Sequence, residues 1–468
     1  MSNSDNKNQF QSTFGFLMAA VGSAVGVGNL WGFPYKMGAN GGFAFLLCYI
    51  VLVAVAAYAI MVGELTLGRR GGRGVIENYR QLGGKYAWIG YFGIISVVLI
   101  GGFCTTLTAY CMKYFVANIG TLFHAGWGIN GADSMEYWST FLQSGTQAIV
   151  FTVISSLITM LILFGGVAGG IERFCKVAMP ALVVMLLIVI IKSNTLPGSG
   201  AGLEFMFKPD WSVFAGKGFI TVLAKAGGQA FFSLSLGMAI MITYGAYLGK
   251  RENIEKSAVV VCVADTAVAL MAGCAIFPAV FALGHEPAGG TALLFGTLQG
   301  VFNDMGSIGP VMGALMYLLV VIAEITSLVS LFEAPIAFMK DYFEERGKTV
   351  SRKTLVIIIT VIDTIIGVIC AADNLGSTGM VQPLGFCWLD FFDLFSEGIL
   401  MPVGSFAMVV LLGWKMGEKW MADEIEQEGV IWRSRKFTMF CMKFVAPVFT
   451  LFILAGQISS FFGLGWFD

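Results

Sequence analysis

Two glycine-rich stretches inside apolar segments contain residue types that bind a cation within a membrane. The first reads GSAVGVGNLWGFP over residues 22–34 and lies in an apolar run from about 14 to 37. A helix broken in hydrocarbon must have its freed backbone groups satisfied, so breaks occur where they line a cavity or hold an ion. The stretch predicts a membrane helix that unwinds near residues 24–28 and presents carbonyl oxygens and the Asn29 amide. Glycines that only allow close helix packing are the alternative.

The second stretch reads GGQAFFSLSLGM over residues 227–238 and supplies the hydroxyl of Ser233. Buried acids and hydroxyls follow in two later apolar segments, namely Asp265, Glu324, Thr326 and Ser327. Hard cations prefer oxygen ligands, and an ionisable group inside a membrane is costly enough to indicate a functional site. A hydroxyl that bonds the carbonyl four residues earlier would explain Thr326 or Ser327 alone. Together with both interruptions and Asp265, the set predicts sodium binding.

The composition is that of a polytopic membrane protein. Of 468 residues, 57% are hydrophobic and only 12% are charged, about half the charged share of a soluble domain. The formal net charge of −1 offers no basic surface for phosphates, so nucleic acid is not expected as a partner. The nine cysteines follow no metal-binding pattern, and the sequence has no hydrolase motif. We expect a protein that is not an enzyme, lies in the lipid bilayer and has no obligate protein partner.

Eleven apolar segments are each long enough to cross a hydrocarbon core about 30 Å thick. They span residues 14–37, 42–68, 88–120, 147–165, 174–192, 219–248, 256–283, 310–341, 352–372, 391–415 and 438–462. The loops on one side carry 21 lysines and arginines, and those on the other side carry 4. By the positive-inside rule, the N-terminus is cytoplasmic and the C-terminus is outside. The acidic stretch 416–428 is expected to be a solvated cytoplasmic linker.

The two interrupted segments are the first and the sixth, five spans apart. Interrupted helices at corresponding positions of two halves are typical of inverted repeats that hold a solute at their interface. We therefore predict an all-α protein with one transporter domain over 1–468. Helices one to five (14–192) form the first repeat, helices six to ten (219–415) form the second, and helix eleven (438–462) is an addition.

Four separated motifs resemble the neurotransmitter:sodium symporter family, and most of all its eleven-span bacterial amino-acid transporters. They lie at residues 22–34, 64–69, 229–238 and 323–327, in the family's order. The resemblance covers nearly the whole chain. It implies the fold of the bacterial leucine transporter, with helices one and six unwound at mid-membrane, and a place in the bacterial cytoplasmic membrane.

The resemblance also implies two sodium sites and a substrate site. The first sodium would be bound by the carbonyl of Ala24 and the side chains of Asn29, Ser233 and Asp265. The second would be bound by the carbonyls of Gly22, Val25 and Ala323 and the hydroxyls of Thr326 and Ser327. The substrate would contact Ala24, Gly26, Val27, Gly28, Cys104, Phe232, Ser233, Ser235, Met238, Ser327 and Leu331. At one of these positions, Cys104, the family normally has a tyrosine that contacts the substrate carboxylate.

Asp265 stands where animal members of the family have a neutral residue and resemble chloride-dependent carriers. A fixed carboxylate can provide the balancing negative charge in place of the anion. We therefore expect transport that does not require chloride. A buried aspartate that is paired for structural reasons is the alternative.

Gates are expected on both sides of the substrate site. On the cytoplasmic side, Lys7 and Asp341 match the ion pair of the family, and Phe10 matches an aromatic plug. Lysine is a less directional partner for a carboxylate than arginine. Phe232 belongs to the gates as well as to the substrate site.

The outer gate departs from the family pattern. Asp393 matches its acidic half, but Gly32 replaces the arginine. Lys225 or Lys36 would then pair with Asp393, and we favour Lys225 because its helix flanks the same vestibule. A lysine that only extends toward the membrane surface is the alternative.

These features predict a sodium-coupled secondary active symporter that imports a small organic solute by alternating access. The apolar walls at Val27, Phe232, Met238 and Leu331 favour an apolar amino acid. Discrimination of about 1–3 kcal/mol per methylene does not specify which one.

Three departures from the family pattern leave alternatives open: Gly32, Cys104 and Glu324. One alternative is a sodium symporter of the same fold for an amine or a modified amino acid. The other is a membrane sensor that binds the solute without transporting it. Glu324, beside the second sodium site, is expected to bind an amine, to tune the sodium or to accept a proton, with structural pairing to a neighbouring helix as the alternative.

Overall fold

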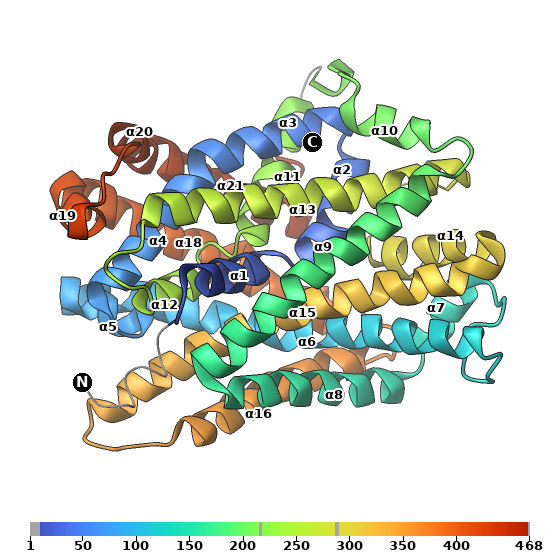
Figure 1. Ribbon diagram of the computed structural model, residues 1–468, viewed down its shortest axis with the longest axis horizontal. Coiled ribbons are helices and arrows are strands. Elements are labelled where there is room, and N and C mark those ends of the chain that lie inside the picture. The colour runs from blue at the N-terminus through green and yellow to red at the C-terminus, as the bar shows by residue number, and fades with distance from the viewer. Residues whose placement is uncertain (1–9, 215–217, 286–289, 467–468) are drawn as a thin grey trace.

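The computed structural model describes residues 10–214, 218–285 and 290–466, and the regular elements in these ranges are all helices (Figure 1). The uninterrupted long helices are α6 (Ala87–Leu122), α8 (Gly145–Phe164), α9 (Arg173–Asn194), α13 (Ile254–Ala282), α15 (Gly309–Glu344) and α16 (Arg352–Asp373). Three further rods each consist of helices joined end to end by π-helical turns. The first joins α3 (Phe43–Leu52) to α4 (Tyr58–Gly71), and the second joins α17 (Trp388–Asp393), α18 (Met401–Val410) and α19 (Gly417–Ile425). The third joins α20 (Arg435–Phe440) to α21 (Ala446–Phe462). The short helices are α5 (Val75–Leu82), α7 (Ser134–Leu142), α10 (Gly200–Phe207) and α14 (Leu298–Asp304).

Two helices are interrupted. The segment α1 (Thr13–Ala24) is followed by Gly28–Ala39, which includes α2 (Phe33–Ala39), and the two halves differ in direction by 49°. The segments α11 (Gly218–Ser233) and α12 (Ile240–Ala246) are separated by the non-helical residues 234–239. Both interruptions lie where the glycine-rich stretches predict them, so the prediction of two broken helices is confirmed.

Within the described ranges, nine helices are long and apolar enough to cross a membrane, and the bent pair at residues 13–39 makes a tenth. The expected sixth span is divided into α11 and α12, with 16 and 7 residues, and a full crossing needs about 20. The all-helical membrane fold is therefore confirmed. The count of eleven crossings and the boundaries of the repeats stay predictions.

The long helices α6 and α15 lie side by side in the bundle (Figure 1). Small residues allow the close approach of neighbouring helices. A Cβ added at Gly102 of α6 would lie 2.3 Å from Ile366 of α16. One added at Gly313 of α15 would lie 2.3 Å from Asn118 of α6. Lipid tails are as apolar as the side chains, so van der Waals contact through small residues is a main source of helix association in a membrane.

Large apolar side chains remain exposed on the outside of the bundle. Val177 and Ile191 of α9 are 71% and 66% exposed, and Val263 of α13 is 63% exposed. Extended apolar surfaces of this kind mark contact with other molecules or with a membrane. On helices of this length, whose backbone groups are bonded internally, the surface is one that faces lipid.

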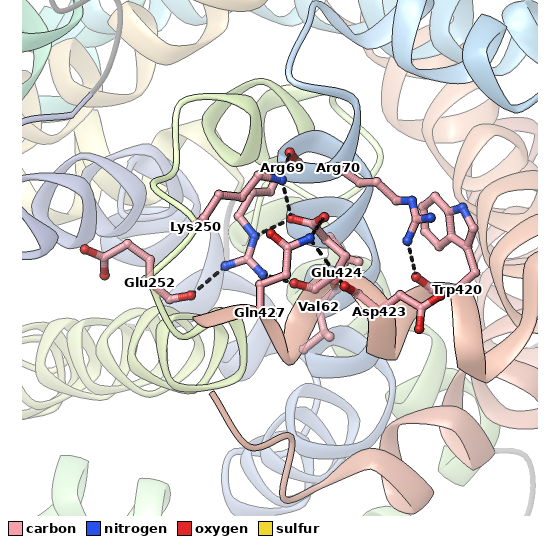
Figure 2. A network of polar contacts seen from close by, with 10 residues as sticks. Val62, Arg69, Arg70, Lys250, Glu252, Trp420, Asp423, Glu424 and Gln427 are labelled. Carbon is pink, nitrogen blue, oxygen red and sulfur yellow. Dashed lines mark hydrogen bonds and ion pairs between the residues drawn. The ribbon is translucent and has the colours of Figure 1, made fainter. Parts of the chain in front are cut away.

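A network of charged side chains joins three segments at one end of the bundle (Figure 2). Arg69, near the end of α4, donates from Nε to Glu424 of α19 (2.7 Å) and from Nη1 to the carbonyl of Glu252 (2.6 Å). Lys250 Nζ donates to the same oxygen of Glu424 at 2.8 Å. The carboxylate of Glu252 in turn accepts a hydrogen bond from the hydroxyl of Thr13 at 2.6 Å. The start of α1 and the loop after α12 are thus tied to two rods that are not broken.

The prediction of a solvated linker over 416–428 is wrong in its central part. Residues 417–425 form α19, and the side chain of Glu424 is buried. The acidic residues of 416–428 suggested a segment exposed to solvent, because buried charges are costly unless they are paired. The partner that removes this cost, Arg69, lies 355 residues away in the sequence.

Replacing Arg69 by glutamine should lower the thermal unfolding midpoint of the detergent-solubilised protein. The change leaves Glu424 with the exposed Lys250 and the neutral amide of Gln427, and breaking a buried ion pair typically costs about 3–5 kcal/mol. Arg70→Gln is the matched control, because Arg70 is exposed and its guanidinium lies 4.6 Å from the ring centre of Trp420. Equal losses in the two variants would contradict a special role of the buried pair.

Candidate functional site

The break after α1 begins where the backbone leaves the helical conformation at Val25 (φ −79°, ψ 107°). Helical backbone angles resume at Val27 (φ −58°, ψ −27°), and a π-helical turn follows over Gly28–Gly32. The freed groups find partners on other helices. The freed amide of Val27 donates to Oε1 of Glu324. The carbonyl of Gly28 accepts from the amide of Phe33 within its own helix and, in addition, from Nε2 of Gln229 at 2.7 Å. Side chains of α15 and α11 therefore satisfy the interrupted backbone.

Left-handed backbone conformations produce the second break. The φ angles of Ser235, Gly237 and Ala239 are 53°, 76° and 61°. Because this conformation costs about 1–2 kcal/mol for a residue with a side chain, the surroundings must hold it. The Gly237 amide donates to Glu64 at 2.7 Å, and the Ser235 hydroxyl donates to the carbonyl of Ser23 in the first break at 3.1 Å. The two breaks are in direct contact.

Asp265 of α13 is the centre of a first oxygen cluster. Its Oδ1 accepts from Asn29 Nδ2 at 2.7 Å, and the Ser233 hydroxyl lies 2.9 Å from Oδ1 and 3.0 Å from Oδ2. The hydroxyl of Tyr49 donates to Oδ2 at 2.9 Å. All three donors are neutral. Two of the residues predicted for the first sodium, Asn29 and Ser233, thus contact the third, Asp265, and the fourth, Ala24, lines the adjoining cavity.

Ser327 of α15 is the centre of a second oxygen cluster. Its Oγ lies 3.3 Å from the carbonyl oxygens of Gly22, Ser23 and Val25 and 3.4 Å from that of Ala323. The neighbouring hydroxyl of Thr326 donates to Ala323 at 2.7 Å. All five residues predicted for the second sodium belong to this cluster, and Ser23 is an additional member. A single hydroxyl proton serves only one of the four carbonyls around it.

A cavity of about 30 Å³ lies between the two clusters. All eleven residues predicted to contact the substrate line it, namely Ala24, Gly26, Val27, Gly28, Cys104, Phe232, Ser233, Ser235, Met238, Ser327 and Leu331. Ser23, Ile100 and Glu324 complete its wall. A volume of this size accepts about one or two water molecules. A larger solute therefore requires the walls to separate.

Glu324 faces the break in α1. A Cβ added at Gly26 would lie 2.9 Å from its Oε1 and 2.8 Å from the hydroxyl of Ser327. Oε1 accepts from the amide of Val27, whereas the buried Oε2 has no hydrogen-bond partner in the part of the chain that the structure describes. Helix N-termini attract negative charge. A carboxylate of the protein itself thus lies at the amide end of the second half of this helix.

The segment before α1 packs against the bundle near the Arg69 network. The ring centre of Phe10 is 5.4 Å from those of Phe16 and Tyr244. The next amide, that of Gln11, donates to Glu172 at 2.7 Å. This packing is compatible with the predicted aromatic plug, although its role in gating stays a prediction.

Asp341, the predicted acidic half of the inner gate, accepts a hydrogen bond from the amide of Gly74 at 2.5 Å. Its predicted partner, Lys7, lies outside the described residues. The inner ion pair therefore stays a prediction.

A larger cavity of about 570 Å³ adjoins the central one and shares Val27, Gly28 and Phe232 with it. Phe232 thus lines both spaces, and its role as a gate stays a prediction. At Gly32, where the resemblance places an arginine in other members, an added Cβ would lie 3.3 Å from Oε1 of Gln229. The amide side chain of Gln229 therefore lies next to Gly32, where a longer side chain would need space.

The two lysines proposed to replace that arginine share a cavity with Asp393. Lys36, Lys225 and Asp393 line a space of about 460 Å³ together with Glu397. Lys225 donates from Nζ to the hydroxyl of Ser460 at 2.7 Å. Lys36 and Asp393 also line the cavity of about 570 Å³ that Phe232 borders. The preference for Lys225 as the partner of Asp393 stays a prediction.

Sequence analysis did not select several residues that hold this site. Glu64 lies in an apolar segment, so the argument used for Asp265 and Glu324 applies to it equally. Tyr49, Gln229 and Glu172 have no such signal, because a tyrosine, a glutamine or an acid near a helix end is common in membrane proteins. Their roles follow only from contacts with other helices.

Comparisons with known proteins agree with this geometry. The model of the sodium:neurotransmitter symporter family matches residues 7–130 and 130–467. A crystal structure of MhsT in complex with L-phenylalanine aligns with a TM-score of 0.84 and 34% identity, over 96% of this chain and 99% of that one.

Two sequence relatives cover most of the chain. The uncharacterized sodium-dependent transporter YhdH of Bacillus subtilis is 29% identical over 96% of this chain and 98% of its own length. A sodium- and chloride-dependent betaine transporter of Caenorhabditis elegans is 23% identical over 88% of this chain and 74% of its own length. The chain is an integral membrane protein that belongs to the sodium:neurotransmitter symporter family, a family of sodium-coupled secondary transporters and not of enzymes.

Proposed function

We propose that this protein is a symporter that uses two sodium ions to import a small organic solute by alternating access. The observation that carries the proposal is the arrangement of the central cavity. Two oxygen clusters, around Asp265 and Ser327, flank one cavity between the two broken helices. The solute would bind in this cavity, beside both ions.

The chemistry of the two clusters supports sodium as the ion. Asp265 is fully buried, and the hydrogen bonds around it come from neutral groups. A buried carboxylate of this kind is stabilised by a cation. Around Ser327, four carbonyl oxygens converge on a hydroxyl that can donate to one of them. Oxygen-rich clusters of this type suit a hard cation.

The solute that we propose is an amino acid with an apolar side chain. Val27, Phe232, Met238 and Leu331 supply apolar walls. The amide end of the second half of helix one offers a favourable position for a carboxylate. The L-phenylalanine bound in the similar structure of MhsT supports this class of solute.

One observation favours a second candidate, a symporter for an amine or a modified amino acid. Glu324 already accepts a hydrogen bond from the amide of Val27, and its other oxygen is unpartnered among the described residues. A substrate carboxylate placed there would meet a like charge. An ammonium group would instead find an acceptor in the cavity wall. Cys104 supplies a thiol in place of the hydroxyl that contacts a substrate carboxylate in the family.

The arrangement of the two cavities also supports a transport cycle with gates. Phe232 lies between the central and the larger cavity. At the opposite end of helix one, the segment 10–12 packs on the bundle: Phe10 contacts Phe16, and the amide of Gln11 donates to Glu172. Alternating access would open these two barriers in turn. We propose the cytoplasm for the end that holds Phe10, because the loops rich in lysine and arginine lie on that side.

Ser327→Ala should weaken sodium binding by about tenfold or more, because it removes a ligand from the second cluster. Binding is measured as the rise of the unfolding midpoint with sodium concentration, at constant ionic strength in potassium, since a ligand stabilises the state it binds. Ser330→Ala is the control, because that hydroxyl contacts Tyr244 at 2.6 Å, one turn away on the same helix. An unchanged sodium dependence in Ser327→Ala would contradict the second site.

Uptake into proteoliposomes should be unchanged when gluconate replaces chloride, because Asp265 supplies a fixed negative charge beside the first sodium site. Asp265→Asn should bind sodium weakly in gluconate and recover part of its affinity in chloride. Asp363→Asn, a second acid buried in the bundle, is the control and should show no chloride effect. Uptake by the unmodified protein that stops without chloride would refute the proposal.

The two solute classes are separated by comparing L-phenylalanine with phenethylamine, which lacks the carboxylate. Under the amino-acid proposal, L-phenylalanine raises the unfolding midpoint in sodium and phenethylamine does not. Under the amine proposal the order is reversed, and Glu324→Gln weakens phenethylamine binding by about 1.5–3 kcal/mol, the value of a hydrogen bond to a charged group. Sodium-independent stabilisation by either compound would favour the sensor alternative.

A further inference from the structure

A groove of about 550 Å³ lies on the outside of the bundle, away from the central cavity. Its walls come from three segments: the α3–α4 rod, α13 and α20. Most of the side chains along it are apolar, among them Ile50, Val53, Val259, Val263, Leu270 and Phe437. None of the residues that line the central cavity also lines this groove.

The groove opens toward the hydrocarbon of the membrane. Each of its walls belongs to a helix that is long and apolar enough to cross the bilayer. Val263, Val259 and Phe437 are 63%, 44% and 47% exposed. Along α13 the lining residues extend from Glu255 to Leu270, which is about 22 Å at 1.5 Å per residue. This length exceeds half of a hydrocarbon core of about 30 Å, so an extended acyl chain of one leaflet fits along it.

Polar contacts close one end of the groove. Glu255, in the first turn of α13, accepts from the amides of Arg433 (3.0 Å) and Ser434 (2.7 Å). The hydroxyls of Tyr58 and Ser434 are 2.8 Å apart. These contacts fix the chain just before α20 to the start of α13. Both oxygens of Glu255 are thus bound by backbone donors, which hold the carboxylate in place and leave its single negative charge at this end of the groove.

Three basic residues surround this polar end. Lys256 lies on the lipid-facing side of α13, one turn before Val259, and Arg433 and Lys436 lie on either side of Ser434 and Arg435. All three side chains are exposed, and none forms an ion pair within the described part of the chain. Arg435 differs, because it pairs with Glu418 at 2.5 Å. Three cations without acidic partners thus stand where an apolar groove meets the membrane surface.

We propose that this groove binds an anionic phospholipid, with an acyl chain along α13 and the phosphate at Lys256, Arg433 and Lys436. Clusters of lysine and arginine beside membrane helices attract anionic headgroups. The groove supplies the apolar contact that a soluble phosphate lacks. A zwitterionic lipid has the same chains but carries its own cation, which the three basic residues repel.

The test uses the full-length protein in detergent, with phosphatidylglycerol and phosphatidylcholine that carry identical oleoyl chains. Native mass spectrometry counts bound lipid, and the unfolding midpoint reports stabilisation. Phosphatidylglycerol should bind about tenfold or more tightly than phosphatidylcholine. The triple variant K256Q/R433Q/K436Q should lose this preference. The control R346Q/K348Q/K353Q, which removes two exposed cations from the loop after α15 and one from the first turn of α16, should keep it.

A second variant tests the groove without changing any charge. Ala267, an exposed lining residue, is replaced by tryptophan to fill the space, and Val184 of α9, 57% exposed elsewhere on the bundle, is replaced by tryptophan as the control. Ala267→Trp should weaken phosphatidylglycerol binding and Val184→Trp should not.

Several results would overturn the proposal. One is equal affinity for phosphatidylglycerol and phosphatidylcholine. Another is an equal loss of phosphatidylglycerol binding in the two triple variants, or in the two tryptophan variants. A third is that glycerol 1-phosphate, which carries the phosphate without acyl chains, stabilises the protein as much as phosphatidylglycerol does. None of these outcomes depends on whether the protein transports an amino acid or an amine.

Discussion

A helix that opens inside a bilayer exposes amide and carbonyl groups where water is not available to bind them. In this protein the amide of Val27 is bound by Glu324, and the amide of Gly237 is bound by Glu64. The carbonyl of Gly28, beside the first break, accepts from Gln229 of α11 in addition to the bond from Phe33. The carboxylates that bind the two amides come from α15 and α4, which are not broken. The two breaks therefore exist only because the rest of the bundle is folded around them, and their position determines where a solute can bind.

The acids of the bundle show how charge is compensated at different depths. Glu424, at the end of the bundle, is paired permanently with Arg69 and Lys250 (Figure 2). Asp265, at the centre, is surrounded by neutral donors instead. A carboxylate with a permanent counter-ion has little affinity left for a mobile cation. A carboxylate held by neutral hydrogen bonds keeps its charge available, as the sodium site that we propose at Asp265 requires.

One helix connects the proposed ion site with the lipid-facing surface. Asp265 of α13 contacts the broken helices, whereas Val263, two residues earlier, is exposed to lipid and lines the outer groove. Two residues correspond to about 200° of rotation at 3.6 residues per turn, so these side chains lie on opposite faces of the helix. A lipid along the outer face would therefore contact the same helix that holds the buried carboxylate.

The sequence by itself determined the features that depend on local composition. Length and apolarity locate the membrane helices, glycines mark the two breaks, and acids within apolar segments, such as Asp265 and Glu324, identify candidate site residues. Resemblance to the family, and not spacing, assigned these residues to particular ions. All eleven predicted substrate contacts line one cavity, although their roles in binding stay predictions.

Only the tertiary structure decided which groups meet. Tyr49 donates to an aspartate 216 residues away, and Gln229 binds a carbonyl 201 residues away. The predicted solvated linker became a helix with a buried acid, because its cation lies on α4. Apolarity and backbone breaks are properties of neighbouring residues, so a single sequence reports them. Hydrogen-bond partners on different helices depend on helix packing and rotation, which a single sequence does not encode as a local pattern.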